Sequence, residues 1–389
     1  MTTLIRNAQI VTADSAANRA SLLVKEGFIV QIGAEAFDGK VDQTIDADGS
    51  VVYPGFIDVH NHGAVGVDVN NADADSLLRV GEFLVSKGVT AWLPTLVPDS
   101  DDNYRRVISQ LDRLIEMQKG YPVAQALGVH FEGVFANEKM CGALRPQYFK
   151  KFTGPEVREL PRPASGVCMT TFAPEVENGI ELVKELVHEG WIASIGHTRA
   201  DVDTLDAAYE AGARHMTHFF NAMTGVHHRD VGVAGWGLSK QGVTFDIIAD
   251  GVHVDPRMVA LACKSKGSGS VSLISDSVAP TGLGDGDFEL WNETITVKNA
   301  RTRNERGSIA GSVATMLDCV KNMRSLGFSD SEVSIMASLN PAKLLGLADS
   351  RGSIEPGKRA DLVAIDGNGN VCWTMIGGEM VEVQKAEVR

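Results

Sequence analysis

The chain has 389 residues, of which 44% are hydrophobic and 22% are charged, and its formal net charge at pH 7 is -14. This length accommodates one barrel-sized domain with a small accessory domain. The acidic balance and the lack of a basic run argue against nucleic acid or an anionic membrane as a partner, because both attract basic surfaces. The amino-terminal sequence has no signal-peptide pattern and no uncharged apolar run reaches about 18 residues, so we expect a soluble, cytoplasmic protein.

The two ends of the chain share a pattern of short alternating strands separated by Gly, Asp and Asn turns, which is typical of a small antiparallel sheet. The expected strands cover residues 4–11, 21–24, 28–32, 361–365, 371–375 and 379–383. We expect residues 1–53 and 347–389 to form one accessory β-sandwich domain.

Residues 54–346 have a different pattern, in which short apolar runs alternate with amphipathic stretches. The apolar runs are at 56–59, 89–96, 127–131, 167–172, 191–195, 215–218, 244–249 and 271–275. Helical periodicity is found at 77–84, 180–187 and 205–211, and later stretches at 313–326 and 330–337 would supply closing helices. Eight strands alternating with helices predict an α/β fold, a (β/α)8 TIM-like barrel. A doubly wound sheet is the alternative, but no G-x-G-x-x-G motif follows the first strand.

The first strand ends in Pro54-Gly-Phe-Ile-Asp-Val-His-Asn-His-Gly63, which places two histidines at positions i and i+2. Residues 51–59 are apolar enough to form one strand buried on both faces, and the spacing directs both imidazoles to one side. We therefore expect His60 and His62 together at the carboxyl end of a strand, where parallel α/β folds hold their active sites. An isolated His-x-His more commonly closes a polar turn.

Four more metal-competent side chains follow other predicted strands: Glu132, His197, His218 and Asp276. In a barrel the carboxyl ends of all strands converge on one mouth, so these side chains would form a ring with His60 and His62. Any one of them could be an ordinary hydrogen-bonded residue, but six metal-competent residues at strand ends are far less expected by chance. Imidazole and carboxylate ligands suit Zn²⁺ or Fe²⁺, and six ligands exceed the number that one catalytic zinc takes. We expect one or two divalent ions, with Glu132 able to bridge them.

Such a ring is typical of hydrolytic chemistry. A divalent ion lowers the pKa of water from ~15.7 to about 7 and polarises a carbonyl. A nearby carboxylate must then move the proton of the water to the leaving group. Asp276 is the candidate for this catalytic acid and base.

Seven segments carry a family resemblance: PGFIDVHNH at 54–62, HFEG at 130–133, GHT at 196–198, THFFNAM at 217–223, ADGVH at 249–253, SDSVAPTG at 275–282 and GSIEPGKRADL at 352–362. Together they resemble the N-acetylglucosamine-6-phosphate deacetylase family of the amidohydrolase superfamily, over nearly the whole chain. The first and last segments occur across the superfamily, whereas the glutamate and the Asn-Ala-Met are specific to these deacetylases. Dihydroorotases and hydantoinases carry a carboxylated lysine where Glu132 stands.

The resemblance implies hydrolysis of N-acetylglucosamine 6-phosphate to glucosamine 6-phosphate and acetate. It implies that Glu132, His197 and His218 hold the main metal ion and that His60 and His62 can hold a second. Three alternatives remain: N-acetylgalactosamine 6-phosphate as substrate, an unphosphorylated N-acyl amino sugar as substrate, or a catalytically silent barrel that serves as a binding subunit.

The resemblance also implies substrate contacts. Asn221, Ala222 and His253 would contact the sugar phosphate, and Arg229 would reach the site of the neighbouring subunit in a homodimer. An arginine provides a planar fork that matches phosphate. A triplet such as His227, His228 and Arg229 is more commonly an exposed polar loop.

One position departs from the family pattern. The family segment after HFEG commonly continues to Gly-Ala-His, whose histidine helps to polarise the amide carbonyl, but here Leu144 and Arg145 follow Gly142-Ala143. Either the second metal ion or Arg145 takes over this role, or the substrate differs from the family norm. We keep Ala143 and Arg145 as candidate substrate contacts.

Overall fold

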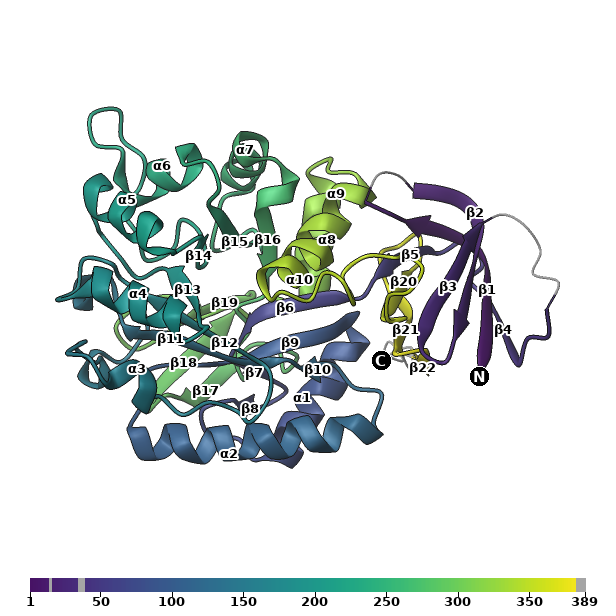
Figure 1. Ribbon diagram of the computed structural model, residues 1–389, viewed down its shortest axis with the longest axis horizontal. Helices are drawn as coiled ribbons and strands as arrows, with labels where there is room; N and C mark the ends of the chain where they lie inside the picture. Colours follow the sequence, from purple (N-terminus) through teal and green to yellow (C-terminus); the bar gives the residue numbers. More distant parts are fainter. Residues whose placement is uncertain (14–15, 34–38, 383–389) are drawn as a thin grey trace.

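The computed structural model describes residues 1–13, 16–33 and 39–382, and Figure 1 shows a helix-covered barrel with a sheet beside it. Residue 383 of the last expected strand, and residues 383–389 of the expected accessory domain, lie outside the described residues. Within the described ranges, no helix is both long enough and apolar enough to cross a membrane.

The predicted (β/α)8 barrel is confirmed. Eight strands pair in parallel and in chain order: β6 (Phe56–Asn61), β9 (Val89–Leu96), β11 (Gly128–Phe135), β12 (Val167–Phe172), β13 (Ile192–Ile195), β14 (His215–Met216), β15 (Thr244–Ile248) and β16 (Val271–Ile274). The barrel closes where β6 meets the end of β16, since the N–H of Asp276 donates to the carbonyl of His60 over 3.0 Å and the N–H of His62 to that of Ser277 over 2.8 Å. The carboxyl ends of the strands therefore share one mouth.

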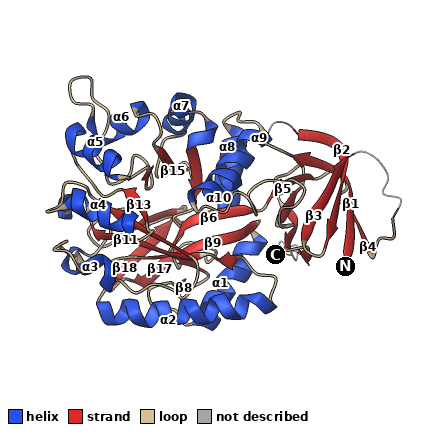
Figure 2. Cartoon of the chain, viewed as in Figure 1, coloured by secondary structure: helices blue, strands red, loops and turns tan. Residues whose placement is uncertain are grey.

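Helices surround the strands (Figure 2). They are α1 (Ala74–Ser86), α2 (Asp101–Met117), α3 (Glu156–Glu159), α4 (Gly179–His188), α5 (Val202–Ala211), α6 (Gly232–Ser239), α7 (Pro256–Lys266), α8 (Met316–Ser325), α9 (Asp330–Ser334) and α10 (Asn340–Leu344), with a π-helical segment at Ile335–Leu339. The periodic segments at 77–84, 180–187 and 205–211 lie in α1, α4 and α5. Five helices were not predicted: α2, α3, α6, α7 and α10.

The expectation of one strand over residues 51–59 is wrong. The run is split at Gly55 into β5 (Val51–Pro54) and β6. The N–H of Gly55 donates to the carbonyl of Asp361, beside the sheet that the two chain ends form, and the next N–H, of Phe56, donates to that of Gly88, beside the barrel strand β9. A Cβ at Gly55 would lie 2.1 Å from Cγ2 of Thr90, so only glycine allows the chain to pass between the two sheets at this point.

Both chain ends contribute to one eight-stranded sheet, here called the end sheet. Its order is β22 (Glu379–Glu382), β21 (Val371–Ile376), β20 (Leu362–Ile365), β5, β1 (Thr2–Val11), β2 (Ala16–Lys25) and β3 (Phe28–Gly33), with β4 (Gln43–Asp46) also paired to β1. One face of these strands encloses a separate core that includes Ile10, Leu22 and Leu362, whereas Val363 and Ile365 join the barrel core. The domain boundaries at residues 53/54 and 346/347 stay a prediction.

A second small sheet was not predicted. The chain leaves the barrel after β16 and forms three antiparallel strands, β17 (Gly286–Leu290), β18 (Glu293–Lys298) and β19 (Arg301–Arg303), here called the insert sheet. A hairpin of β7 (Gly63–Ala64) and β8 (Val67–Asp68) follows the first strand, and β10 (Gln125–Ala126) extends the barrel sheet beside β9.

Candidate active site

The six residues of the predicted ring lie together at the mouth of the barrel. His60 lies in β6 and Glu132 in β11, whereas the others follow the ends of their strands. The sixth strand is shorter than the run 215–218, because β14 ends at Met216, and His218 lies in the turn beyond it. All six residues are buried, with exposed fractions of 7% or less: His60, His62, Glu132, His197, His218 and Asp276.

Glu132 stands at the centre of two histidine pairs. Its Oε1 atom lies 3.1 Å from Nε2 of His197 and 3.0 Å from Nε2 of His218. The same carboxylate lies 3.5 Å from Nε2 of His60 through Oε1 and 3.3 Å from Nε2 of His62 through Oε2. Two groups, each able to hold one ion, therefore share this carboxylate.

The imidazole nitrogens in each pair point at one another. The Nε2 atoms of His197 and His218 are 3.0 Å apart, and those of His60 and His62 are 3.1 Å apart. Two unprotonated nitrogens at this distance direct their lone pairs into the same space, which favours a cation there. Nitrogen and oxygen donors in such a set fit a divalent transition metal ion.

Hydrogen bonds on the outer side of two rings fix their orientation. Nδ1 of His62 lies 3.1 Å from the carbonyl oxygen of Thr95, and Nδ1 of His197 lies 2.7 Å from that of Met140. A carbonyl only accepts, so Nδ1 carries a proton and Nε2 is the nitrogen that faces the cluster. This is the tautomer that binding of a metal ion through Nε2 requires.

Three of the ring residues have a left-handed backbone. The φ angles are 48° for His197, 32° for His218 and 50° for Asp276. Residues with a Cβ seldom adopt this region, and each such residue costs about 1–3 kcal/mol. The turns that follow β13, β14 and β16 thus direct side chains into the mouth at some expense of stability.

Mutual electrostatics set the protonation of the metal-free ring. Burial raises the pKa of Glu132, but the imidazoles of His60, His197 and His218 outweigh it and hold that pKa well below its usual range. Burial also raises the pKa of Asp276, and His60 and His62 bring it below its usual value. Burial lowers the pKa of His62 and His218, yet the neighbouring carboxylates raise these pKa values to about 10 and about 9.

Comparison with known proteins identifies the family. Residues 51–381 match the Amidohydrolase family. This chain belongs to the amidohydrolase family. The family implies a divalent metal ion, and the two His/Glu groups within the ring could each hold one.

Relatives of this amidohydrolase agree with the resemblance carried by its sequence motifs, which is thereby confirmed. The N-acetylglucosamine-6-phosphate deacetylase of Bacillus subtilis (strain 168) is 33% identical over 386 residues, covering 98% of each chain. An N-acetylgalactosamine-6-phosphate deacetylase of Escherichia coli O157:H7 is 31% identical over 382 residues, covering 98% of this chain and 99% of that one. The crystal structure of N-acetylglucosamine-6-phosphate deacetylase from Pasteurella multocida superposes with a TM-score of 0.90 at 29% identity, covering 98% of this chain and 100% of the other.

A buried polar network that was not predicted connects the chain segments that carry two of the ring residues. The carboxylate of Asp58, which is fully buried, accepts from Oγ of Ser275 over 2.6 Å and from Nδ2 of Asn61 over 3.1 Å. Asn61 also donates to Oγ of Ser277 over 2.7 Å. These bonds join residues that flank His60 to residues that flank Asp276. The sequence signal was Asp58 itself, a charged residue inside an apolar run.

Two aromatic side chains pack against the histidine pair. The ring of His130 lies edge-on to His60 with centroids 4.7 Å apart, and its Nε2 is 2.7 Å from Oγ1 of Thr171. The indole of Trp291, from the insert sheet, lies edge-on to His62 at 5.4 Å and donates to Asp68 over 3.3 Å. Trp291 had no sequence signal, because nothing in the chain predicts that the hairpin between β17 and β18 reaches the mouth.

The segment that departs from the family pattern lies beside the ring. Leu144 is buried in an apolar cluster that also contains Val278 and Trp291. Arg145 is buried as well and donates from Nη2 to Asp99 over 2.7 Å. The carbonyl of Ala143 accepts from Arg306 over 3.1 Å. Arg145 therefore already has a carboxylate partner, and its role as a substrate contact stays a prediction.

The other candidate substrate contacts follow β14 and β15. Asn221 and Ala222 are half-buried in the turn after His218, where Nδ2 of Asn221 donates to the carbonyl of His218 over 3.3 Å. His253 is held by a 2.7 Å contact between its Nδ1 and Oδ2 of Asp250. Arg229 lies apart from these residues in the exposed run 225–230, in contact with His228 over 2.8 Å.

Proposed function

We propose that this amidohydrolase removes the acetyl group of an N-acetyl amino sugar 6-phosphate, with N-acetylglucosamine 6-phosphate as the preferred substrate. The observation that carries the proposal is Glu132, which lies within 3.5 Å of four histidine nitrogens at the barrel mouth. The Bacillus subtilis relative, an N-acetylglucosamine-6-phosphate deacetylase, supports the substrate. The Escherichia coli relative supports N-acetylgalactosamine 6-phosphate as the second candidate.

In this proposal the ring residues hold the metal. Glu132, His197 and His218 would hold one divalent ion, and His60, His62 and Glu132 would hold a second. Zn²⁺ and Fe²⁺ are the ions that suit these imidazole and carboxylate donors. A divalent ion here supplies positive charge that acidifies water and polarises an amide carbonyl.

Asp276 performs the proton transfers. Its Oδ1 atom lies 3.4 Å from Nε2 of His60 and 3.3 Å from Nε2 of His62, so it faces the same space as the four imidazoles. The carboxylate accepts a proton from the attacking water and returns it to the nitrogen of the amide. The C–N bond breaks, acetate retains the oxygen of the water, and the sugar leaves as a free amine.

The phosphate is held away from the ring. Asn221, Ala222 and His253 contact the sugar phosphate, and Arg229 contributes from the partner of a homodimer. The exposure of Arg229, whose guanidinium touches only His228 within the described part of the chain, supports a role toward another molecule.

The test is acetate release from a panel of amino sugars by the metal-loaded enzyme. We expect the highest kcat/KM for N-acetylglucosamine 6-phosphate, followed by its galactosamine epimer and then by the unphosphorylated sugars. A preference for the galactosamine epimer would select the second candidate. Acetate release from none of them by protein with full metal content would favour a catalytically silent barrel.

A further inference from the structure

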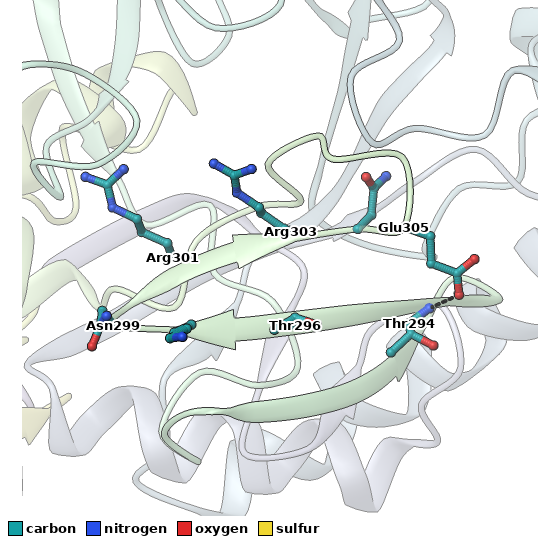
Figure 3. Close-up of a pocket in the computed structure, with 8 residues that line it drawn as sticks. Thr294, Thr296, Asn299, Arg301, Arg303 and Glu305 are labelled. Atoms are coloured by element: carbon teal, nitrogen blue, oxygen red, sulfur yellow. Dashed lines mark hydrogen bonds between the residues drawn. The ribbon is translucent and has the colours of Figure 1, made fainter.

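The outer face of the insert sheet has a depression of about 680 Å³ (Figure 3). Its lining includes Lys298 from β18, Arg301 and Arg303 from β19, and Asn304 just beyond, here called the cationic face. Figure 3 shows the side chains of Arg301 and Arg303 extending from β19 toward the same side. None of these residues takes part in the amidohydrolase ring.

Strand register explains why the cations share one face. Lys298 is paired directly with Arg301, and Thr296 directly with Arg303. Residues directly opposite in an antiparallel pair project to the same side, and their neighbours project to the other. The burial pattern agrees, because these four residues are exposed whereas Thr302, between the two arginines, is buried.

The charges on this face are not neutralised. Like charges directly opposite each other, such as Lys298 and Arg301, destabilise a strand pair. In the described ranges, none of the three cations lies within ion-pair distance of a carboxylate, although the nearby Arg306 pairs with Glu293 over 3.1 Å. A chain with a net charge of -14 thus keeps, in its described part, three cations without an ion-pair partner around one depression.

Asn304 adds a buried donor that has no partner. Its side chain is only 5% exposed, and its Oδ1 accepts from the N–H of Ser308 over 2.9 Å. This bond fixes the orientation of the amide and so identifies its other terminal atom as the donor Nδ2. Nδ2 of Asn304 has no acceptor within the described residues. A buried donor without a partner costs about 1–3 kcal/mol, so an acceptor from outside the chain would be stabilising.

The carboxylates near the depression are already occupied by donors. Oε1 of Glu305, which also lines the depression, accepts from the N–H of Thr294 over 3.1 Å. Oδ1 of Asp287, on the neighbouring strand, accepts from Oγ1 of Thr296 over 2.6 Å. The lining therefore offers three cations and one amide N–H, and the carboxylate of Glu305 adds one negative charge.

We propose that the cationic face binds the phosphate group of a small phosphorylated molecule, at a site separate from the catalytic ring. Guanidinium groups match phosphate oxygens through paired hydrogen bonds, and a lysine adds a point charge. Three cations on a strongly acidic chain are too few for nucleic acid, which requires an extended basic surface. The depression has a volume in the range of small-molecule sites.

The test is calorimetric titration of the metal-loaded enzyme with inorganic phosphate and, separately, with glucose 6-phosphate, which lacks an acetyl group. The double variant R301Q/R303Q should weaken one binding event at least about tenfold, because two charge-assisted contacts are lost. The double variant R79Q/R105Q removes the same charge from exposed positions in α1 and α2 and should bind as the parent does. If only inorganic phosphate binds, a phosphorylated sugar is excluded as the ligand.

Asn304→Asp is the second variant. Its carboxylate can still accept from the N–H of Ser308, but the free donor becomes an acceptor with negative charge. We expect the same binding event to be lost, and the melting temperature, measured alongside, shows whether the variant is folded at the temperature of the titration. Undiminished binding by either variant, or binding of short nucleic acid duplexes in place of both phosphates, would overturn the proposal. Turnover is not the readout, so failure here leaves the proposed deacetylase activity untouched.

Discussion

The backbone N–H of Asp276 donates to the carbonyl oxygen of His60 across 3.0 Å, and this bond joins the last strand of the barrel to the first. The side chains of the two residues also meet, with Oδ1 of Asp276 3.4 Å from Nε2 of His60. Barrel closure therefore sets the position of the proposed acid and base relative to a proposed metal ligand. A change to either side chain can alter the chemistry without changing the backbone contact.

Asp276→Asn should keep the fold and the metal content but lose turnover. The amide has nearly the same shape, but it cannot accept and return a proton. We expect kcat for acetate release to fall by about 10²-fold or more. Asp203→Asn, at an exposed position in α5, is the matched control and should turn over as the parent does. Turnover near the parent level in Asp276→Asn would place the proton transfer on another group.

The double variant H60A/H62A should lose one equivalent of bound metal. Glu132, His197 and His218 keep their mutual contacts of 3.0–3.1 Å in this variant, so they can retain the other ion. The measurement is elemental analysis after loading with excess Zn²⁺ and removal of free ion.

H227A/H228A is the control for this count, because it removes two histidines from an exposed loop outside the ring. Its metal content should equal that of the parent. A parent protein that never binds more than one equivalent would rule out the two-ion arrangement.

Arg229→Ala should weaken catalysis for phosphorylated substrates only. The guanidinium makes charge-assisted contacts with phosphate, each contributing about 1.5–3 kcal/mol. We therefore expect kcat/KM for N-acetylglucosamine 6-phosphate to fall by about one to two decades, and that for N-acetylglucosamine to stay nearly constant. Arg257→Ala, at an exposed position in α7, is the control.

Two outcomes would contradict this prediction. Equal losses on both sugars would assign Arg229 to stability or assembly, and a parent enzyme indifferent to phosphate would remove the reason for a phosphate site. Leu144 and Arg145, which depart from the family pattern, are then the first positions at which to look for altered substrate choice.

Metal binding should release protons at pH 7. In the metal-free ring the pKa of His62 is about 10 and that of His218 about 9, so both imidazoles carry an extra proton below those values. A ligand nitrogen must be unprotonated, so metal and protons compete and affinity rises with pH up to about 10. Calorimetry in two buffers of different ionisation enthalpy measures the protons released. Affinity that is constant between pH 6 and 8 would disagree with these pKa values.

Much of the barrel could be predicted because its strands are buried on both faces. The runs 89–96 and 167–172 coincide with β9 and β12, since a continuous apolar run bounded by polar residues leaves little choice of where the strand begins and ends. The break at Gly55 could not be predicted, because it depends on the contact with Thr90 from another strand. The insert sheet escaped prediction because its strands are short and half exposed.

The ring could be predicted for a different reason. Parallel strands bring their carboxyl ends together whatever their separation in sequence, so His197 and Asp276 could be placed near His60. The turns that aim these side chains have left-handed backbones, which the sequence does not indicate for histidine or aspartate. Contacts made from outside the barrel strands, such as that of Trp291 with His62, depend on tertiary packing alone.

The most direct test of the central claim is acetate release before and after removal of the metal. Protein stripped with a chelator should release no acetate from N-acetylglucosamine 6-phosphate, and reloading with Zn²⁺ or Fe²⁺ should restore release with one free amine formed per acetate. Acetate release that persists at parent rate in protein with no measurable metal would contradict the account, as would a fully metal-loaded protein that leaves this substrate intact.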